Sequence, residues 1–181
     1  MKRTLLTSAL AVSLSGLLAG MPIIAAAEDI DIFTGASGGT SVNPRILIVL
    51  DNTSNWARQS QQWPGGLQQG QSEARAIKNL LPTLDSTVSL GLMEFVTAGN
   101  ANDDGGFIRS AIQPLTDTAK ASFGTQLDTI YNNINSPDEK RNSHTPYGDL
   151  MYDVYNYFAG GNSYSPGGVL SSIADSSGYT N

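Results

Sequence analysis

The apolar residues of this chain fall into short runs and helical stripes that polar loops separate. Residues 45–50 end in five consecutive aliphatic side chains, a pattern typical of a strand buried on both faces of a parallel sheet. We therefore predict that this run is the central first strand. Residues 87–96 and 107–115 read as two further strands, and the polar turn between them predicts a hairpin.

Three other segments carry apolar residues at helical spacing, namely 71–81, 117–134 and 145–158. Pro82 follows the first helix, Pro146 suits the first turn of the third, and Gly160 ends it. The order strand, helix, strand, strand, helix, helix predicts a doubly wound α/β fold. Three strands would leave apolar sheet surface uncovered, so we expect this fold to be incomplete.

The first 27 residues have the layout of a secretory signal peptide. Lys2 and Arg3 precede an apolar run over 5–19, and three alanines come before the predicted cleavage point after Ala27. The run is shorter than the ~20 residues of a spanning helix, so an uncleaved anchor is the weaker interpretation. We predict an exported protein with a signal peptide at 1–27, a flexible polar leader at 28–43, one domain at 44–160, and a poorly ordered Gly/Ser/Tyr-rich tail at 161–181.

Charge narrows the range of partners. Cleavage removes two basic residues and leaves 8 basic and 16 acidic ones, a net charge of about −8. Repulsion then disfavours nucleic acid and anionic membrane as partners, and we expect no membrane insertion after cleavage. The same charge is compatible with binding a divalent cation. The chain has no cysteine, so it folds without disulfides.

A polar cluster directly after the first predicted strand is the candidate site. Open α/β sheets bind ligands beyond the carboxyl ends of their strands. Asp51, Thr53 and Asn55 offer a carboxylate, a hydroxyl and an amide oxygen, which are hard ligands suited to Mg²⁺, Mn²⁺ or Ca²⁺. Thr145 can add a hydroxyl from a second loop. We predict a metal site at these four residues, and no catalytic or organic cofactor site.

These residues resemble the metal-ion-dependent adhesion site of von Willebrand factor A (vWA) domains. In that family an Asp-x-Ser-x-Ser loop follows the first strand, a second loop gives a Thr, and a third gives an Asp. Asp51, Thr53 and Asn55 match the first loop, with Asn55 in place of the second Ser, and Thr145 matches the second. The third loop has no counterpart. The resemblance implies a Rossmann-like vWA fold that is incomplete at its C-terminal side, with a degenerate metal site.

A narrower resemblance, over about residues 44–160, is to the PilY/PilC family of type IV pilus tip proteins. It rests on the stretches 51–56, 61–64, 70–77 and 91–95. In that family a vWA domain precedes a β-propeller, for which this chain has no counterpart. The resemblance implies a non-catalytic module for adhesion or pilus biogenesis in the periplasm, on the outer surface or at the pilus tip. Its expected partners are minor pilus subunits or ligands on host or abiotic surfaces.

Two alternatives to this function stay open. The fold could be a scaffold in a pilus or envelope protein that binds no metal. A strand ending in Asp also opens the haloacid dehalogenase phosphatases, whose general acid lies two residues after the nucleophile. Thr53 occupies that position, so the chain would lack the acid, and we predict that it is not an enzyme.

Several other polar or aromatic residues have a functional and a structural interpretation. His144 could orient a ligand, although an exposed loop histidine is the more common case. Trp56 and Trp63 could contact a partner or cover the metal loop. Asp149 and Asp153 fall within a helical pattern, and we interpret both as solvated. A partial calcium-loop pattern from residue 100 has Ala111 where the bidentate Glu belongs, so a hairpin turn explains it better.

Overall fold

The computed structural model describes residues 43–58, 62–99, 104–141, 145–165 and 173–179. All of them belong to the unit formed by residues 42–181. The predicted signal peptide, His144 and all of the predicted leader except residue 43 lie outside the described residues. In the part of the chain that is described, no helix is both long and apolar enough to cross a membrane.

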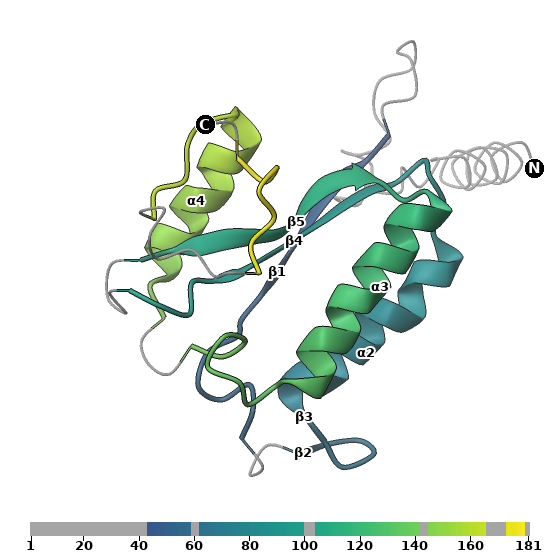
Figure 1. Cartoon of the computed structure of the whole chain (residues 1–181), viewed down its shortest axis with the longest axis vertical. Helices are drawn as coiled ribbons and strands as arrows, with labels where there is room; N and C mark the ends of the chain where they lie inside the picture. The colour runs from purple at the N-terminus through teal and green to yellow at the C-terminus, as the bar shows by residue number, and fades with distance from the viewer. Residues whose placement is uncertain (1–42, 59–61, 100–103, 142–144, 166–172, 180–181) are drawn as a thin grey trace, which may run out of the picture. The chain divides into compact units, whose positions relative to one another are not determined.

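A three-stranded mixed sheet forms the middle of this unit (Figure 1). Its strands are β1 (Arg45–Leu50), β4 (Ser89–Phe95) and β5 (Gly106–Pro114), in the order β1-β4-β5. β1 runs parallel to β4, with Leu50 opposite Glu94, and β5 runs antiparallel to β4. The predicted strands and the predicted hairpin are therefore confirmed.

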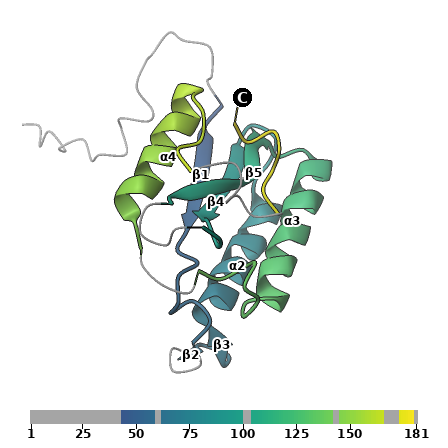
Figure 2. The ribbon, with the colours of Figure 1, turned by 60° about the vertical axis from the view of Figure 1, so that its left-hand side comes forward.

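The three predicted helices are also present, each with ends within two residues of the predicted ones. They are α2 (Gln69–Leu80), followed by a short 3₁₀ turn η2 (Leu81–Thr83), then α3 (Asp117–Asn132) and α4 (Tyr147–Ala159). α4 ends at Gly160, whose φ of 71° is the left-handed conformation that glycine adopts without strain. Figure 2 shows α2 and α3 on one face of the sheet and α4 on the other. The result is a three-layered α/β arrangement, consistent with an incomplete α/β fold.

Alternate residues of β4 fill two separate cores. Leu90 and Leu92 pack with α2 and α3, and Met93 and Phe95 pack with Leu150 of α4. Successive side chains of a strand point to opposite faces, so one strand serves both layers. Every residue of β4 is buried.

This arrangement corrects the prediction that the strand at 45–50 is the central one. Among the described residues, β1 is an edge strand with β4 as its one partner, and β4 is central. Ile46 and Val49 of β1 are 43% and 38% exposed. An aliphatic run shows that a strand can be buried. Whether it is buried depends on the strands and helices that pack beside it, and the run does not specify them.

A small hairpin lies within the stretch predicted to be a polar loop. β2 (Gln62–Trp63) and β3 (Leu67–Gln68) are antiparallel, and Gly65 and Gly66 form the turn with φ of 87° and 71°. Trp63 is exposed there, whereas Trp56 lies in the core and donates to Glu73 (2.9 Å). Trp56 therefore serves packing, and the hairpin was missed because its strands are only two residues long.

Part of the predicted tail runs along the side of β5 that faces away from β4. The backbone N–H of Asp175 donates to Ile108 O (2.8 Å), and the Asp175 carboxylate accepts from Ala111 N (2.9 Å). The hydroxyl of Tyr157 in α4 accepts from Ile112 N (2.7 Å). Groups of the same chain thus occupy backbone positions on the outer edge of β5. These contacts were not predicted, because the tail at 161–181 carries no pronounced apolar pattern.

Candidate functional site at the carboxyl end of β1

The chain leaves β1 at Asp51, beside the end of β4. Asp51 is partly exposed, and its Oδ1 accepts from the backbone N–H of Thr53 (3.2 Å), which fixes a tight turn. Thr53 is only 8% exposed, and Asn55 is exposed. This places one ionisable oxygen ligand and one hydroxyl within a three-residue loop, with the amide of Asn55 directed towards solvent.

The start of α4 reaches the same loop. The hydroxyl of Tyr147 donates to Asp51 Oδ2, and the backbone N–H of Tyr147 donates to Thr145 O (2.7 Å). The Tyr147 ring also packs edge-to-face on Phe95, at the end of β4 (centroids 5.3 Å apart). The two predicted metal loops therefore meet through Tyr147. Thr145 itself is exposed and makes no hydrogen bond to Asp51.

The contact with Asp51 changes the chemistry of the phenol. The hydrogen bond that Tyr147 donates to Asp51, partial burial and the negative charge of Asp51 together raise the pKa of Tyr147 to about 12. Tyr147 is therefore a neutral hydrogen-bond donor over the whole physiological range, and it holds one oxygen of Asp51. Sequence reasoning missed Tyr147, although its position two residues after Thr145 was a usable signal.

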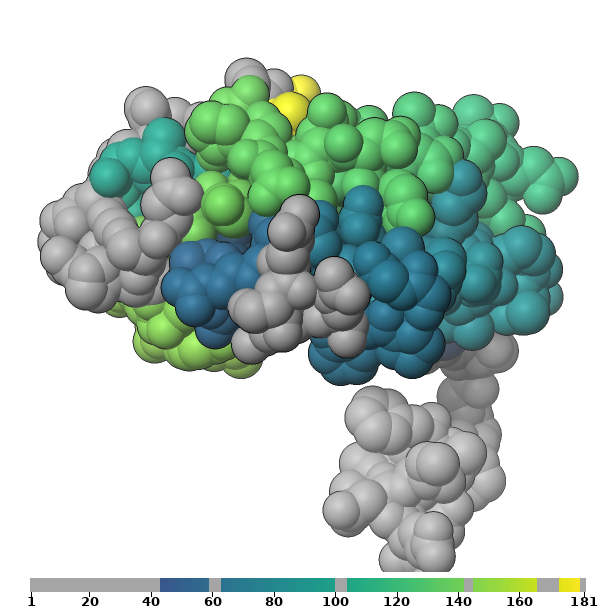
Figure 3. Space-filling model, turned by 90° about the horizontal axis from the view of Figure 1, so that it is seen from below, coloured from purple at the N-terminus to yellow at the C-terminus, as the bar shows by residue number. Residues whose placement is uncertain are grey.

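Asn52 fixes the loop after β1 through hydrogen bonds to buried backbone groups. Its side chain is fully buried, donates to Phe95 O (3.1 Å) and Glu139 O (3.2 Å), and accepts from Phe95 N (2.9 Å). The backbone N–H of Arg141 donates to Asn52 O (2.8 Å). Asn52 thus ties together the ends of β1 and β4 and the loop that follows α3. Figure 3 shows the loop after β1 and the loop after α3 side by side at this end of the unit.

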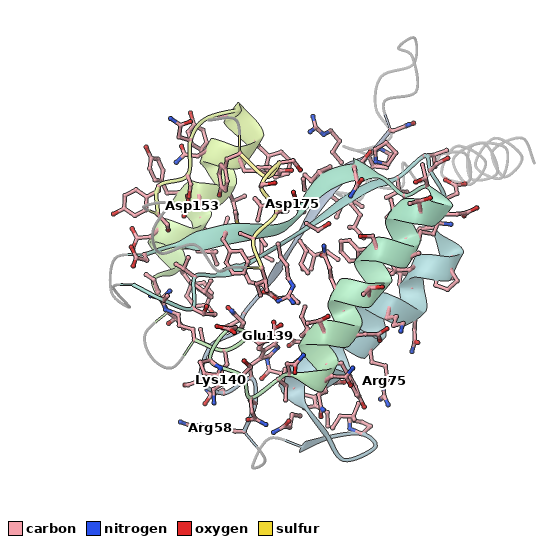
Figure 4. All side chains as sticks on the ribbon, viewed as in Figure 1. Arg58, Arg75, Glu139, Lys140, Asp153 and Asp175 are labelled. Carbon is pink, nitrogen blue, oxygen red and sulfur yellow. The ribbon has the colours of Figure 1, made fainter. Side chains whose placement is uncertain are left out.

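A buried charge cluster supports that second loop. Arg109 of β5 donates to Glu94 (3.0 Å) and forms a bidentate salt bridge with Glu139. All three side chains are at most 3% exposed. Glu139 is labelled in Figure 4. Burial raises the pKa of Glu94 to about 7, against the opposing effect of Arg109, and the charge of Glu139 adds to the rise. Burial is the largest of these effects, so Glu94 stays protonated to a higher pH than an exposed glutamate does.

Asp153 is buried, which corrects the prediction that it is a solvated helix residue. Its side chain is 0% exposed and accepts from Gly106 N (2.9 Å), Tyr164 N (2.6 Å) and Ser165 Oγ (3.2 Å). Figure 4 labels it on α4. Burial raises its pKa, although these donors oppose the rise. Asp153 lies on the side of α4 that faces the sheet, and its position in the sequence did not reveal this. Asp149, which was also predicted to be solvated, is half-buried.

Within the described ranges, no group of three or more His, Cys, Asp or Glu residues is placed to hold a metal ion. The predicted site has only one carboxylate, so its ligand set would be mostly neutral. Metal binding by Asp51, Thr53, Asn55 and Thr145 stays a prediction. Comparison with protein-family models, curated proteins and solved structures gives no significant match to this chain.

Proposed function

We propose that this chain is a non-catalytic vWA-type module of a type IV pilus tip or biogenesis protein, exported and acting in adhesion or pilus assembly. The proposal joins the resemblance of the sequence with one observation. A partly exposed carboxylate, Asp51, lies at the carboxyl end of β1 and touches the start of α4 through Tyr147. Open α/β sheets place their ligand sites at this position.

The residues present fit a weak cation site better than a strong one. Asp51 supplies the single negative charge, Thr53 lies beside it, and Thr145 precedes the helix that touches it. A bound divalent cation would give the surface a positive centre able to take an acidic group of a minor pilus subunit or a surface ligand. With one carboxylate, we expect dissociation constants on the order of 10⁻⁴ to 10⁻³ M.

Calorimetric titration with Mg²⁺, Mn²⁺ and Ca²⁺ tests this site. We expect weak binding that Asp51→Ala abolishes. Asp149→Ala is the matched control. It also removes one carboxylate, in the first turn of α4, and should leave the affinity for the cation unchanged. Tyr147→Phe releases an oxygen of Asp51 and should keep or raise the affinity. Binding to purified minor pilus subunits, in Mg²⁺ and in EDTA, then tests the role of the cation.

A metal-free scaffold is the second candidate function, and a specific contact favours it. Both oxygens of Asp51 already accept hydrogen bonds, one from Thr53 N and one from Tyr147. In this case Asp51 joins β1 to α4 and holds no ion. The absence of any heat of binding at millimolar cation, with Asp51→Ala behaving as the unaltered chain does, would select this candidate. A phosphatase assay, expected to show no turnover, tests the non-catalytic part of the proposal.

A further inference from the structure

The buried charge cluster contains more negative than positive groups. Glu94 and Glu139 both contact one guanidinium, that of Arg109. Arg109 forms two hydrogen bonds with Glu139 and one with Glu94, and Glu94 Oε1 and Arg109 Nε have no hydrogen-bond partner among the described residues. A buried carboxylate with an unpaired oxygen is costly to ionise. Glu94 is therefore the carboxylate of the two that more readily keeps a proton.

The charged groups that act on Glu94 come from two elements. They are Arg109 of β5 and Glu139 of the loop after α3. β1, α2 and α3 contribute apolar residues to the core on this side of the sheet, such as Leu50, Ala74 and Leu127. Water screens charges little in such surroundings, so ionisation of Glu94 acts strongly on Glu139.

The backbone holds the two carboxylates with unequal firmness. Glu94 belongs to β4, which pairs with a strand on each side and has every residue buried. Glu139 lies outside the helices and strands, in a loop whose turn is closed by hydrogen bonds from Glu139 N and Lys140 N to Ser136 O (3.1 and 3.0 Å). When Glu94 loses its proton, the repulsion between the two carboxylates is therefore relieved most readily by movement of the loop.

This loop contacts the turn that carries Asp51, and Figure 3 shows the two side by side. Asn52 Nδ2 donates to Glu139 O (3.2 Å), and the backbone N–H of Arg141 donates to Asn52 O (2.8 Å). We infer that the buried charge cluster is a pH-dependent switch, which holds the loop after α3 against Asn52 while Glu94 is protonated and releases it when Glu94 ionises. The switch acts at the end of the sheet where ligands bind, and it needs no cation.

The direction of the pH dependence follows from the number of bound protons. Burial raises the pKa of Glu94 from 4.5 to about 7 while the loop is closed, and entry of water on opening returns it towards its ordinary value. The closed state therefore binds more protons, so it is favoured at low pH and is lost as the pH rises through about 7. From pH 6 to pH 8, the equilibrium constant for opening should rise about tenfold.

Amide hydrogen exchange of the purified full chain, followed by NMR at pH 6 and pH 8, tests the switch. The N–H of Arg141 reports on the contact between loop and turn. Its protection factor, corrected for the intrinsic effect of pH on exchange, should fall about tenfold. The N–H of Val88, which donates to Asp85 O before β4 begins, should keep its protection. No fall at Arg141, or an equal fall at Val88, overturns the inference.

Three variants separate the roles of the carboxylates. Glu94→Gln imitates the protonated side chain, so Arg141 should stay protected at both pH values. Glu139→Gln weakens the contact of the loop with Arg109, so it should lower the protection already at pH 6 and reduce its pH dependence. Asp138→Asn, at an exposed position of the same loop, is the matched control and should keep the tenfold fall. A fall of the same size in Glu94→Gln overturns the inference.

The carboxyl carbon resonances give a second readout, which requires no substitution and so does not depend on the folding of a variant. In ¹³C spectra of the unaltered chain, the resonance that titrates with a midpoint near 7 should be that of Glu94. Titration of Glu139 in its place would put the proton on the loop carboxylate. That result would overturn the inference as well.

Discussion

Two aspartates connect α4 to the sheet, and they do so in opposite ways. Asp153 is fully buried, and its oxygens accept from a strand and from the loop after α4. Asp51 is partly exposed, and its oxygens accept from its own turn and from Tyr147. A buried carboxylate surrounded by donors has no capacity left for a ligand, whereas one at the rim has. Asp153 therefore stabilises the fold, and Asp51 is the aspartate of the two that a ligand can reach.

The largest expected effect comes from removing the buried aspartate. Asp153→Ala leaves the donors of Gly106, Tyr164 and Ser165 unpaired and should lower the free energy of unfolding by about 3 to 5 kcal/mol. Asp153→Asn keeps one acceptor and should cost roughly half as much. Urea unfolding followed by tryptophan fluorescence measures both. Asp149→Ala, on the same helix, should cost less than about 1 kcal/mol. Equal losses in the free energy of unfolding for Asp149→Ala and Asp153→Ala would show that the buried contacts of Asp153 do not stabilise the fold.

The second effect is a dependence of stability on pH, and it comes from another buried carboxylate, Glu94. Its pKa rises from 4.5 to about 7 in the folded chain, so the folded state binds more protons than the unfolded state between these values. Stability should therefore be highest below pH 4.5 with respect to this group, and fall by roughly 1 to 3 kcal/mol as pH rises to 7.

Glu94→Gln isolates this contribution, because the amide does not titrate. Unfolding curves at pH 5, 6, 7 and 8 should show a shallower decline for Glu94→Gln than for the unaltered chain. Titrating groups away from the cluster of Glu94, Arg109 and Glu139 are common to both proteins, and their effects cancel in the difference. Parallel curves would show that Glu94 remains ionised throughout.

The smallest effect on stability comes from the hydrogen bond between Tyr147 and the partly exposed Asp51. Tyr147→Phe removes one hydrogen bond to a partly exposed carboxylate and should cost about 0.5 to 1.5 kcal/mol. A double-mutant cycle with Asp51→Asn should give a coupling energy of at least about 0.5 kcal/mol, since the two side chains touch. Tyr155→Phe, whose residue is 66% exposed, is the control and should be neutral. A loss as large as that of Asp153→Ala would make Asp51 a structural residue too.

Periodicity was sufficient to predict the long elements of the fold. The helical stripes of α2, α3 and α4 and the apolar runs of β1 and β4 are local patterns, and each was found within a few residues. The edge position of β1 was not predictable, because strand order depends on contacts between distant segments. The two-residue strands β2 and β3 are too short to carry a period.

The candidate site was predicted in part. The rule that ligands lie beyond the carboxyl ends of strands pointed to Asp51 and Thr53, and it also led to the start of α4. It did not reveal Asn52 or Tyr147, whose roles come from partners 43 and 96 residues away. Asp153 was misread because helical spacing does not show which face of α4 meets the sheet.

The segment that runs along the outer edge of β5 has a consequence for solubility. Asp175 and Tyr157 occupy backbone groups of Ile108, Ala111 and Ile112, so another strand finds few free groups to pair with on that edge. Removing residues 173–179 would free the groups of Ile108 and Ala111 that Asp175 now occupies. An unprotected aliphatic edge is a template for strands of other chains, so the shortened chain should aggregate more readily.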